Sequence, residues 1–384
     1  MMTKEEVNTG RQIEFDYLKG IFMLFIFLVH AFQATGSEFG PFFSCIYIFA
    51  TMSGAAIYIF VLGFGVSYSD RTTPGRLAKR GIILVVYQYL SNLLYVLTLT
   101  IPYFFVRNTL SAEGAENHSF YVWVFAQYLN IFFISGIIYL VLALLKKLRL
   151  PVFGYVVLAV IFAVLAPILY GTEVDIPVIG YITTMLIGEA PFVSFTPLCF
   201  ISYALIGVAV GKMYRRIADK SLFYKRLITI CIIIIVLWWI SVFIRFKLSP
   251  EEWGFVKDFV SLGQVMDFAY TQPDLWHVIA SLSHVGLFAG LLYFYEEHRK
   301  RNSSDPEKRG LIPSQFLFYS SHISKYYALH IAVDLFAYAM HGYLGFSSGA
   351  ACILALVSMI VTEVLVRLTL RVNSSLSRKR ISVS

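Results

Sequence analysis

The chain has 384 residues, of which 58% are hydrophobic and 14% are charged, and its mean hydropathy is +0.72. A soluble domain carries about 25% charged residues, so this composition excludes a soluble globular protein and indicates an integral membrane protein. The formal net charge of +8 could indicate a nucleic-acid partner. The positions of the basic residues along the chain, described below, argue against this interpretation.

Ten apolar segments are long enough to cross a bilayer, which takes about 20 residues in a helix. These segments lie near 15–34, 42–67, 81–104, 120–144, 151–170, 192–213, 227–246, 275–295, 315–340 and 348–370. We therefore predict an all-α polytopic membrane protein with about ten transmembrane helices, in a single domain over residues 1–384. The first segment is too long for the apolar part of a signal peptide, so we expect it to remain as a helix.

Basic residues are concentrated in alternate connections. The N-terminus, the connections at 68–80, 145–150, 212–226 and 296–314, and the C-terminus together hold 24 Lys and Arg, whereas the other loops hold 4. This bias predicts that the basic side is cytoplasmic. Both termini, including the tail 371–384, are then cytoplasmic. The positive charge reflects topology, so we expect the lipid bilayer as a partner and no nucleic acid. The longest loops, which we place on the outer side, lie near 105–119, 171–191 and 247–274.

Three ionisable residues share one face of the first segment, IEFDYLKGIFMLFIFLVHAF at 13–32. At about 100° per residue, Lys19 and His30 are offset by about 20°, and Asp16 and His30 by about 40°. The rise from Lys19 to His30 is about 16 Å, which places Lys19 near the cytoplasmic edge and His30 in the outer half of the bilayer. Because a charged group in lipid is costly, such a residue within a span marks a candidate functional site.

Each of these residues also has a structural interpretation. Asp16 and Lys19 could be interfacial residues, with Lys19 extending toward the membrane boundary, and His30 could be a core histidine bonded to a neighbouring helix. Their alignment on one stripe favours a common site.

A second polar cluster lies in the ninth segment. His330 and Asp334 are four residues apart, so they share a helix face. They could form an orienting base–carboxylate pair or a buried structural hydrogen bond. We interpret Glu363 and His284, two further ionisable residues within spans, as interhelical polar contacts.

The stretch FDYLKGIFMLFIFLVH resembles the first-helix signature of the acyltransferase-3 and heparan-α-glucosaminide N-acetyltransferase-like superfamily of transmembrane acyltransferases. That signature has an Asp, an Arg, a Gly and an apolar stretch that ends in His. Lys19 stands where Arg is usual, which keeps the charge without the planar guanidinium. Four later stretches resemble later helices of that fold, in the same order: IYIFATMSGAAIYIFVLGFGVSYS, GRLAKRGIILVVYQYLSNLLY, SFTPLCFISYALIGVAVGK and FLFYSSHISKYYALHIAVDLF.

The resemblance implies an enzyme that takes an acyl group, usually acetyl, from acetyl-CoA on the cytoplasmic side. The acyl group passes to a hydroxyl or amine of a glycan or other envelope polymer on the outer side, and acyl-CoA is a co-substrate with no bound cofactor. A bacterial plasma membrane is the expected location. His30 would act as general base or as an acylated nucleophile, and the residues leave these two roles open.

The cytoplasmic end offers cations for a phosphorylated donor. We predict Lys19, Arg76 and Arg80 as substrate-binding residues, although the topology bias alone would place basic residues there. Asp16 lies one turn from Lys19 and could orient it by an ion pair; with His30 we count it among the catalytic residues. Ser53, in the second-helix stretch, and the pair His330 and Asp334 complete the predicted substrate-binding set.

Two alternatives stay open at this level. The same intramembrane ionisable residues would suit a proton-coupled secondary transporter, and His330 could be the catalytic residue of a different membrane acyltransferase class. The sequence contains no Walker loop, H-E-x-x-H, G-x-S-x-G or Cys/His metal spacing, so we expect no metal site.

Overall fold

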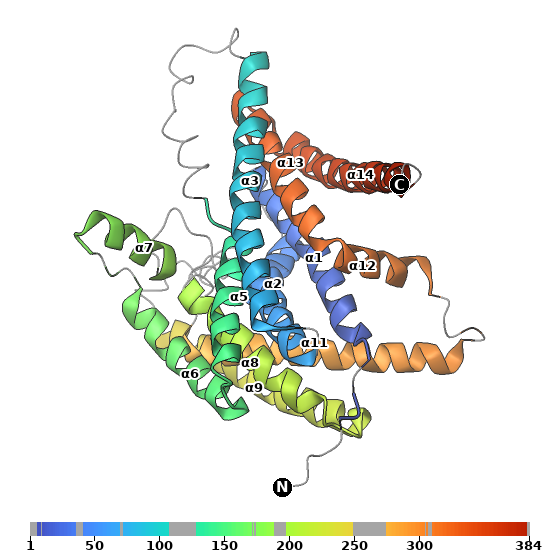
Figure 1. Ribbon diagram of the computed structural model, residues 1–384. Helices are drawn as coiled ribbons and strands as arrows, with labels where there is room; N and C mark the ends of the chain where they lie inside the picture. The colour runs from blue at the N-terminus through green and yellow to red at the C-terminus, as the bar shows by residue number, and fades with distance from the viewer. Residues whose placement is uncertain are drawn as a thin grey trace.

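The computed structural model describes residues 6–8, 10–35, 41–69, 72–106, 128–170, 172, 174–187, 197–248, 274–303, 305 and 309–381. Every regular element in these ranges is an α-helix (Figure 1). In chain order they are α1 (Ile13–Ala34), α2 (Pro41–Tyr68), α3 (Pro74–Val106), α5 (Ile131–Lys147), α6 (Val152–Leu169), α7 (Pro177–Ile187), α8 (Pro197–Tyr214), α9 (Lys220–Leu248), α11 (Leu275–Asn302), α12 (Leu311–Ser321), α13 (Ile323–Leu344) and α14 (Ser348–Ile381).

Seven helices in the described ranges are long and apolar enough to cross a bilayer. They are α1, α6, α8, α11 and the apolar parts of α3, α9 and α14. Large apolar side chains such as Ile82 on α3, Ile233 on α9 and Ile360 on α14 are exposed, as expected of surfaces that contact lipid tails. The chain is therefore a multi-pass membrane protein, as its composition predicted. The predicted count of ten spans is not confirmed.

The predicted ninth span is divided into two helices. α12 ends at Ser321 and α13 begins at Ile323, with His322 between them. The hydroxyl of Ser321 donates to the Phe318 carbonyl at 2.9 Å, and His322 Nδ1 lies 3.0 Å from the same oxygen. Side chains that bond nearby backbone groups compete with the helical ladder, which gives the break a local cause. A single span over 315–340 was the wrong prediction here.

The predicted outer loop at 171–191 also contains an element. Residues Pro177–Ile187 form the short helix α7, which begins with a proline, a residue suited to the first turn of a helix. The first residues of the predicted spans 120–144 and 192–213 lie outside the described ranges.

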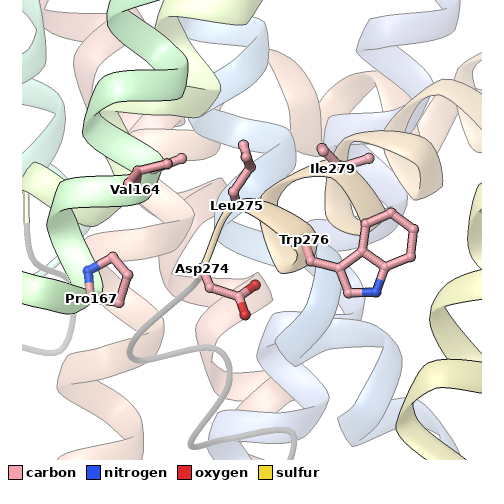
Figure 2. A pocket seen from close by; sticks show the side chains of 7 residues that line it. Val164, Pro167, Asp274, Leu275, Trp276 and Ile279 are labelled. Atoms are coloured by element: carbon pink, nitrogen blue, oxygen red, sulfur yellow. The ribbon is translucent and has the colours of Figure 1, made fainter.

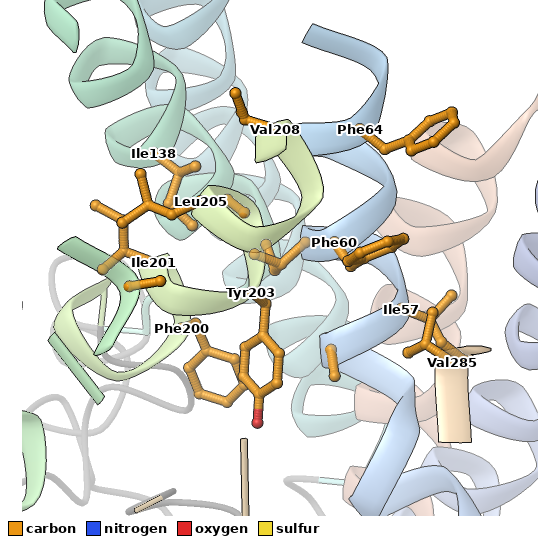
Figure 3. Packing of buried hydrophobic residues seen from close by; sticks show 14 of the residues in the cluster. Ile57, Phe60, Phe64, Ile138, Phe200, Ile201, Tyr203, Leu205, Val208 and Val285 are labelled. Atoms are coloured by element: carbon orange, nitrogen blue, oxygen red, sulfur yellow. The ribbon is translucent and has the colours of Figure 1, made fainter. Parts of the chain in front are cut away.

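Among the described helices, α2 and α8 have the most extensive contact. Figure 3 shows side chains of both helices in the core, such as Phe60 and Phe64 of α2 and Tyr203 and Leu205 of α8. Glycines allow the two backbones to approach. A Cβ at Gly63 would lie 1.9 Å from the carbonyl oxygen of Ala204, and one at Gly207 would lie 2.2 Å from that of Phe60. Small residues at such positions are typical of helix pairs in membranes, where close van der Waals packing replaces the hydrophobic effect.

A polar clamp joins α3 to the start of α5. Gln88 Oε1 accepts hydrogen bonds from the backbone N–H groups of Asn130 (3.1 Å) and Phe133 (3.2 Å), and the Asn130 side chain accepts from Phe132 N at 3.0 Å. Backbone donors at a helix start have no partner within the helix and must be satisfied in a low-dielectric interior. The buried Gln88 therefore serves as a cap for a helix on another part of the chain.

α1 lies at the centre of the helices (Figure 1) and contacts α2, α11, α12, α13 and α14. Its polar stripe is consequently surrounded by protein. The helix that carries Asp16, Lys19 and His30 is thus positioned to bring these groups against the α12–α13 segment.

Candidate functional site

His30 of α1 and His330 of α13 meet inside the helix assembly. His30 Nδ1 lies 3.0 Å from His330 Nε2, and the two rings are nearly parallel, with an interplanar angle of 11° and centroids 5.2 Å apart. Both residues were predicted site residues, but their direct contact was not predicted.

The hydrogen bonds define the tautomers of the neutral pair. His330 Nδ1 lies 2.9 Å from the carbonyl oxygen of Tyr326, which can only accept, so this nitrogen carries the proton. His330 Nε2 is then the acceptor, and His30 Nδ1 donates to it. The remaining nitrogen of His30, Nε2, therefore has a free lone pair, which is the property required of a general base or a nucleophile.

Aromatic residues fix the pair from two sides. The Phe27 ring lies 4.7 Å from the His330 ring, and the Tyr327 ring meets the same imidazole edge-on at 5.1 Å. His330 is 1% exposed, whereas His30 is only partly buried. His30 is accordingly the more exposed member of the pair.

Asp334 lies beside the pair but does not form a base–carboxylate hydrogen bond with His330, which was one of the two roles that the spacing left open. Both ring nitrogens of His330 have other partners, Tyr326 and His30. Asp334 Oδ1 instead accepts from the hydroxyl of Ser358 on α14 at 3.0 Å, and its Oδ2 is buried without a hydrogen-bond partner. The (i, i+4) spacing identified two neighbours, but the orienting contact to His330 comes from a backbone carbonyl.

Asp16 and Lys19 form the other end of the stripe. Lys19 Nζ lies 2.9 Å from Asp16 Oδ1, which is the expected ion pair, and Arg11 Nε lies 2.5 Å from Asp16 Oδ2. The hydroxyl of Ser320 on α12 donates to Asp16 Oδ1 at 3.2 Å. Asp16 thus contacts α12 and His30 contacts α13, so the stripe faces the α12–α13 segment along its length.

Apolar side chains fill the stripe between these two ends. Met23 is 0% exposed and Phe27 is also buried, and both pack in a cluster with Tyr326 of α13. In this arrangement the basic end at Lys19 and the imidazole at His30 are separated by packed side chains.

The other predicted substrate-binding residues lie on α2 and α3. Arg76 and Arg80 are exposed on the first turns of α3, and the Arg80 guanidinium lies over the Tyr139 ring of α5 at 5.0 Å. Ser53 on α2 is buried, and its hydroxyl has no hydrogen-bond partner. The neighbouring Gly54 packs against Ile26 of α1, one turn before His30.

Sequence reasoning missed the residues that support the pair. Tyr326, which accepts from His330, donates its own hydroxyl to Glu363 Oε2 at 2.6 Å, and Ser358 holds Asp334. Glu363 had been interpreted as an interhelical contact, and the structure confirms this. For His284 the structure describes a bond on its own helix, from Nδ1 to the carbonyl of Ala280 at 2.8 Å, so an interhelical contact stays a prediction.

A separate open pocket of about 410 Å³ lies between α6 and the start of α11. Figure 2 shows Val164 and Pro167 on one side and Asp274, Leu275, Trp276 and Ile279 on the other. Trp276 Nε1 donates to the hydroxyl of Ser241 at 3.0 Å. The lining residues belong to neither α1 nor α13, so this pocket is distinct from the histidine pair.

Comparisons of the chain with family models, with curated proteins and with solved structures find no match.

Proposed function

We propose that this protein is a membrane acyltransferase that moves an acyl group from a cytoplasmic acyl-CoA to a hydroxyl or amine of an extracytoplasmic glycan or envelope polymer. The observation that supports the proposal is the 3.0 Å contact between His30 Nδ1 and His330 Nε2. This contact leaves Nε2 of the partly buried His30 as proton acceptor within a helix assembly of bilayer-spanning length. The topology bias in Lys and Arg supports a cytoplasmic position for Lys19 and an outer position for His30.

Direct transfer needs one proton acceptor and one electrophile. His30 Nε2 takes the proton from the acceptor hydroxyl as its oxygen attacks the thioester carbonyl. The new C–O bond forms, the C–S bond breaks, and the coenzyme A thiolate leaves and takes up the proton from His30. His330 accepts the His30 Nδ1–H throughout and disperses the positive charge that develops on the ring. The reaction is balanced without any further reactant.

An acylated His30 is the other form of the same proposal. In that form Nε2 attacks the thioester, coenzyme A leaves, and the acceptor hydroxyl then takes the acyl group from the imidazole. A covalent intermediate predicts that label stays on the protein when the acceptor is omitted, whereas direct transfer predicts none.

The donor has to travel between the two ends of the stripe. Lys19 offers a cation for the donor phosphates at the cytoplasmic end. Met23 and Phe27 fill the intervening α1 face, so these side chains and the facing α12–α13 segment must move for a pantetheine arm to reach His30. Transfer therefore includes a conformational step in this proposal.

The test uses the full-length protein in proteoliposomes. Radiolabelled acetyl-CoA is supplied on the cytoplasmic side of the protein, and candidate glycans are supplied on the opposite side. We expect label on a glycan with the parent protein, a loss of at least about 100-fold with His30→Ala, and no change with His298→Ala. His298 is exposed on α11 and serves as the matched histidine control. Equal labelling by His30→Ala and the parent overturns the site assignment.

The alternative function is distinguished in the same vesicles. A proton-coupled transporter would accumulate solute in response to a pH gradient without any acyl donor, and this flux would collapse with a protonophore. Such flux, together with absent acyl transfer, would refute the acyltransferase proposal.

A further inference from the structure

Three ligand-type side chains converge at the histidine pair. His30, His330 and Asp334 each offer one atom, and these atoms all lie within 4.8 Å of one another. We propose that these three residues bind a divalent transition-metal ion of the zinc class. The inference goes beyond the proposed function and does not rest on it, since metal binding needs neither acyl donor nor acceptor.

In His330 and Asp334, the side-chain atom that would not bind the metal already has a hydrogen-bond partner. His330 Nδ1–H donates to the Tyr326 carbonyl at 2.9 Å, which leaves Nε2 unprotonated on the inner side. Asp334 Oδ1 accepts from Ser358 Oγ at 3.0 Å, which leaves Oδ2 for the inner side. Metal-binding histidines and carboxylates commonly have such outer hydrogen bonds, which fix the tautomer and orient the ligand atom.

Asp334 Oδ2 provides an independent indication. It is buried and has no hydrogen-bond partner among the described residues, and Asp334 as a whole is 5% exposed. Burial of an unpaired carboxylate oxygen carries a desolvation cost that no partner offsets. A cation held between Oδ2 and the two imidazole nitrogens would satisfy this oxygen.

The ligand chemistry selects the class of metal. Two imidazole nitrogens and one carboxylate suit zinc and its neighbours in the first transition row, whereas Mg²⁺ and Ca²⁺ need about six or more oxygen ligands. With Zn–N bonds of about 2.0–2.1 Å, tetrahedral geometry puts two ligand nitrogens about 3.3 Å apart. The observed separation of 3.0 Å between His30 Nδ1 and His330 Nε2 needs only a small adjustment.

Three protein ligands leave a fourth position for water or substrate, as in catalytic zinc sites. His30 is the least buried of the three ligands. The ion would replace the proton that the two imidazoles share in the metal-free pair. An acceptor hydroxyl bound at the open position would be more acidic there. With the ion on Nδ1, the proton of a neutral His30 moves to Nε2, so the proton-accepting role proposed for Nε2 belongs to the metal-free pair.

The test measures metal on the full-length protein in detergent, without substrates. Protein purified without chelators is analysed for metal by mass spectrometry, and chelator-stripped protein is titrated with Zn²⁺ alone. We expect about one Zn²⁺ per chain. Asp334→Asn, which keeps the side-chain volume, and His30→Ala should each weaken Zn²⁺ binding by at least about 100-fold, and Ser358→Ala by about tenfold. His298→Ala is the matched control and should bind like the parent.

Variants are compared only where their elution volume and helix content match those of the parent. Because Asp334→Asn is nearly isosteric, it keeps the test decisive if His30→Ala does not fold. Absence of stoichiometric Zn²⁺ on the parent protein, or equal affinity in the parent and Asp334→Asn, overturns the metal site and leaves a hydrogen-bonded histidine pair. Acyl transfer by a protein that binds no Zn²⁺ refutes this inference alone, and Zn²⁺ binding by a protein that transfers no acyl group refutes only the proposed function.

Discussion

The hydroxyl of Tyr326 donates a hydrogen bond to Glu363 Oε2 over 2.6 Å and so joins α13 to α14. The backbone carbonyl of the same tyrosine accepts from His330 Nδ1. Glu363 is further held by Gln315 of α12 at 3.1 Å and by Arg367 at 2.6 Å. The turn of α13 that orients the histidine pair is therefore anchored to two other helices by one carboxylate.

Tyr326→Phe removes this anchor while keeping the ring. A hydrogen bond to a charged group contributes about 1.5–3 kcal/mol in general, and interhelical ones in membranes average about 0.6 kcal/mol, so we expect a loss near 1 kcal/mol in the free energy of unfolding. Thermal unfolding in detergent measures it. The control is Tyr338→Phe on the same helix, whose side chain is 53% exposed, and this variant should unfold like the parent. Equal unfolding temperatures for the two variants would show that the Tyr326 anchor contributes nothing.

Glu296 on α11 provides a second test of buried charge. It is 1% exposed and bonds Arg299 at 2.8 Å, Arg309 at 3.2 Å and the Tyr17 hydroxyl at 3.2 Å. Removing one partner of a buried ion pair typically costs about 3–5 kcal/mol, because the other charge is left uncompensated.

We therefore expect Glu296→Gln to lower the unfolding temperature far more than Glu297→Gln. Glu297 is the adjacent residue, is only half-buried and contacts Lys300 at 3.4 Å, and exposed pairs contribute about 0–1 kcal/mol. The measurement is thermal unfolding of both variants in parallel, with their unfolding temperatures compared with that of the parent. Similar destabilisation by both would mean that the Glu296 cluster behaves like a surface pair.

The α2–α8 contact predicts opposite effects for two glycines on one helix. A Cβ at Gly63 would collide with the Ala204 carbonyl at 1.9 Å, whereas one at Gly65 meets no atom within 4 Å. Gly63→Ala should destabilise the protein by about 1–3 kcal/mol through overpacking. Gly65→Ala should be neutral or stabilise it by up to about 1 kcal/mol, because alanine is favoured over glycine within a helix. A stable Gly63→Ala variant would contradict the close approach of α2 and α8.

Helix positions could be predicted from the sequence because apolar length is a local property. The first segment, expected at 15–34, forms α1 at Ile13–Ala34, and its polar stripe faces one neighbouring segment as the helical period requires. The break at His322 depended on side-chain bonds to Phe318 O. The polar run Ser320–Ser321–His322 was a signal for it.

The histidine pair could not be predicted as a contact. His30 and His330 lie 300 residues apart, and the period of one helix says nothing about which other helix packs against it. The same holds for Asp334, for which spacing on one helix left a pairing with His330 open, whereas its carboxylate is held by Ser358 of another helix. Local spacing identified the ionisable groups, and the packing of α1, α13 and α14 determined their partners.

Lys19 allows a test of the proposed donor binding that is separate from the chemistry proposed for His30. Its ammonium nitrogen lies 2.9 Å from Asp16 Oδ1, and 23% of the Lys19 side chain is exposed. The group is therefore oriented and also accessible to a phosphate. Lys19→Gln should raise the KM for acyl-CoA by about tenfold, equivalent to about 1.4 kcal/mol, with kcat nearly unchanged, because the contact is equally strong before and during transfer. Lys19→Arg keeps the charge, and its KM for acyl-CoA should stay within about threefold of that of the parent, since guanidinium also binds phosphate.

Lys300→Gln, at an exposed position on α11, controls for the general loss of a positive charge. If Lys19→Gln lowers kcat and leaves KM unchanged, Lys19 acts by holding α1 against α12 through Asp16 and Ser320, and the donor phosphates bind elsewhere.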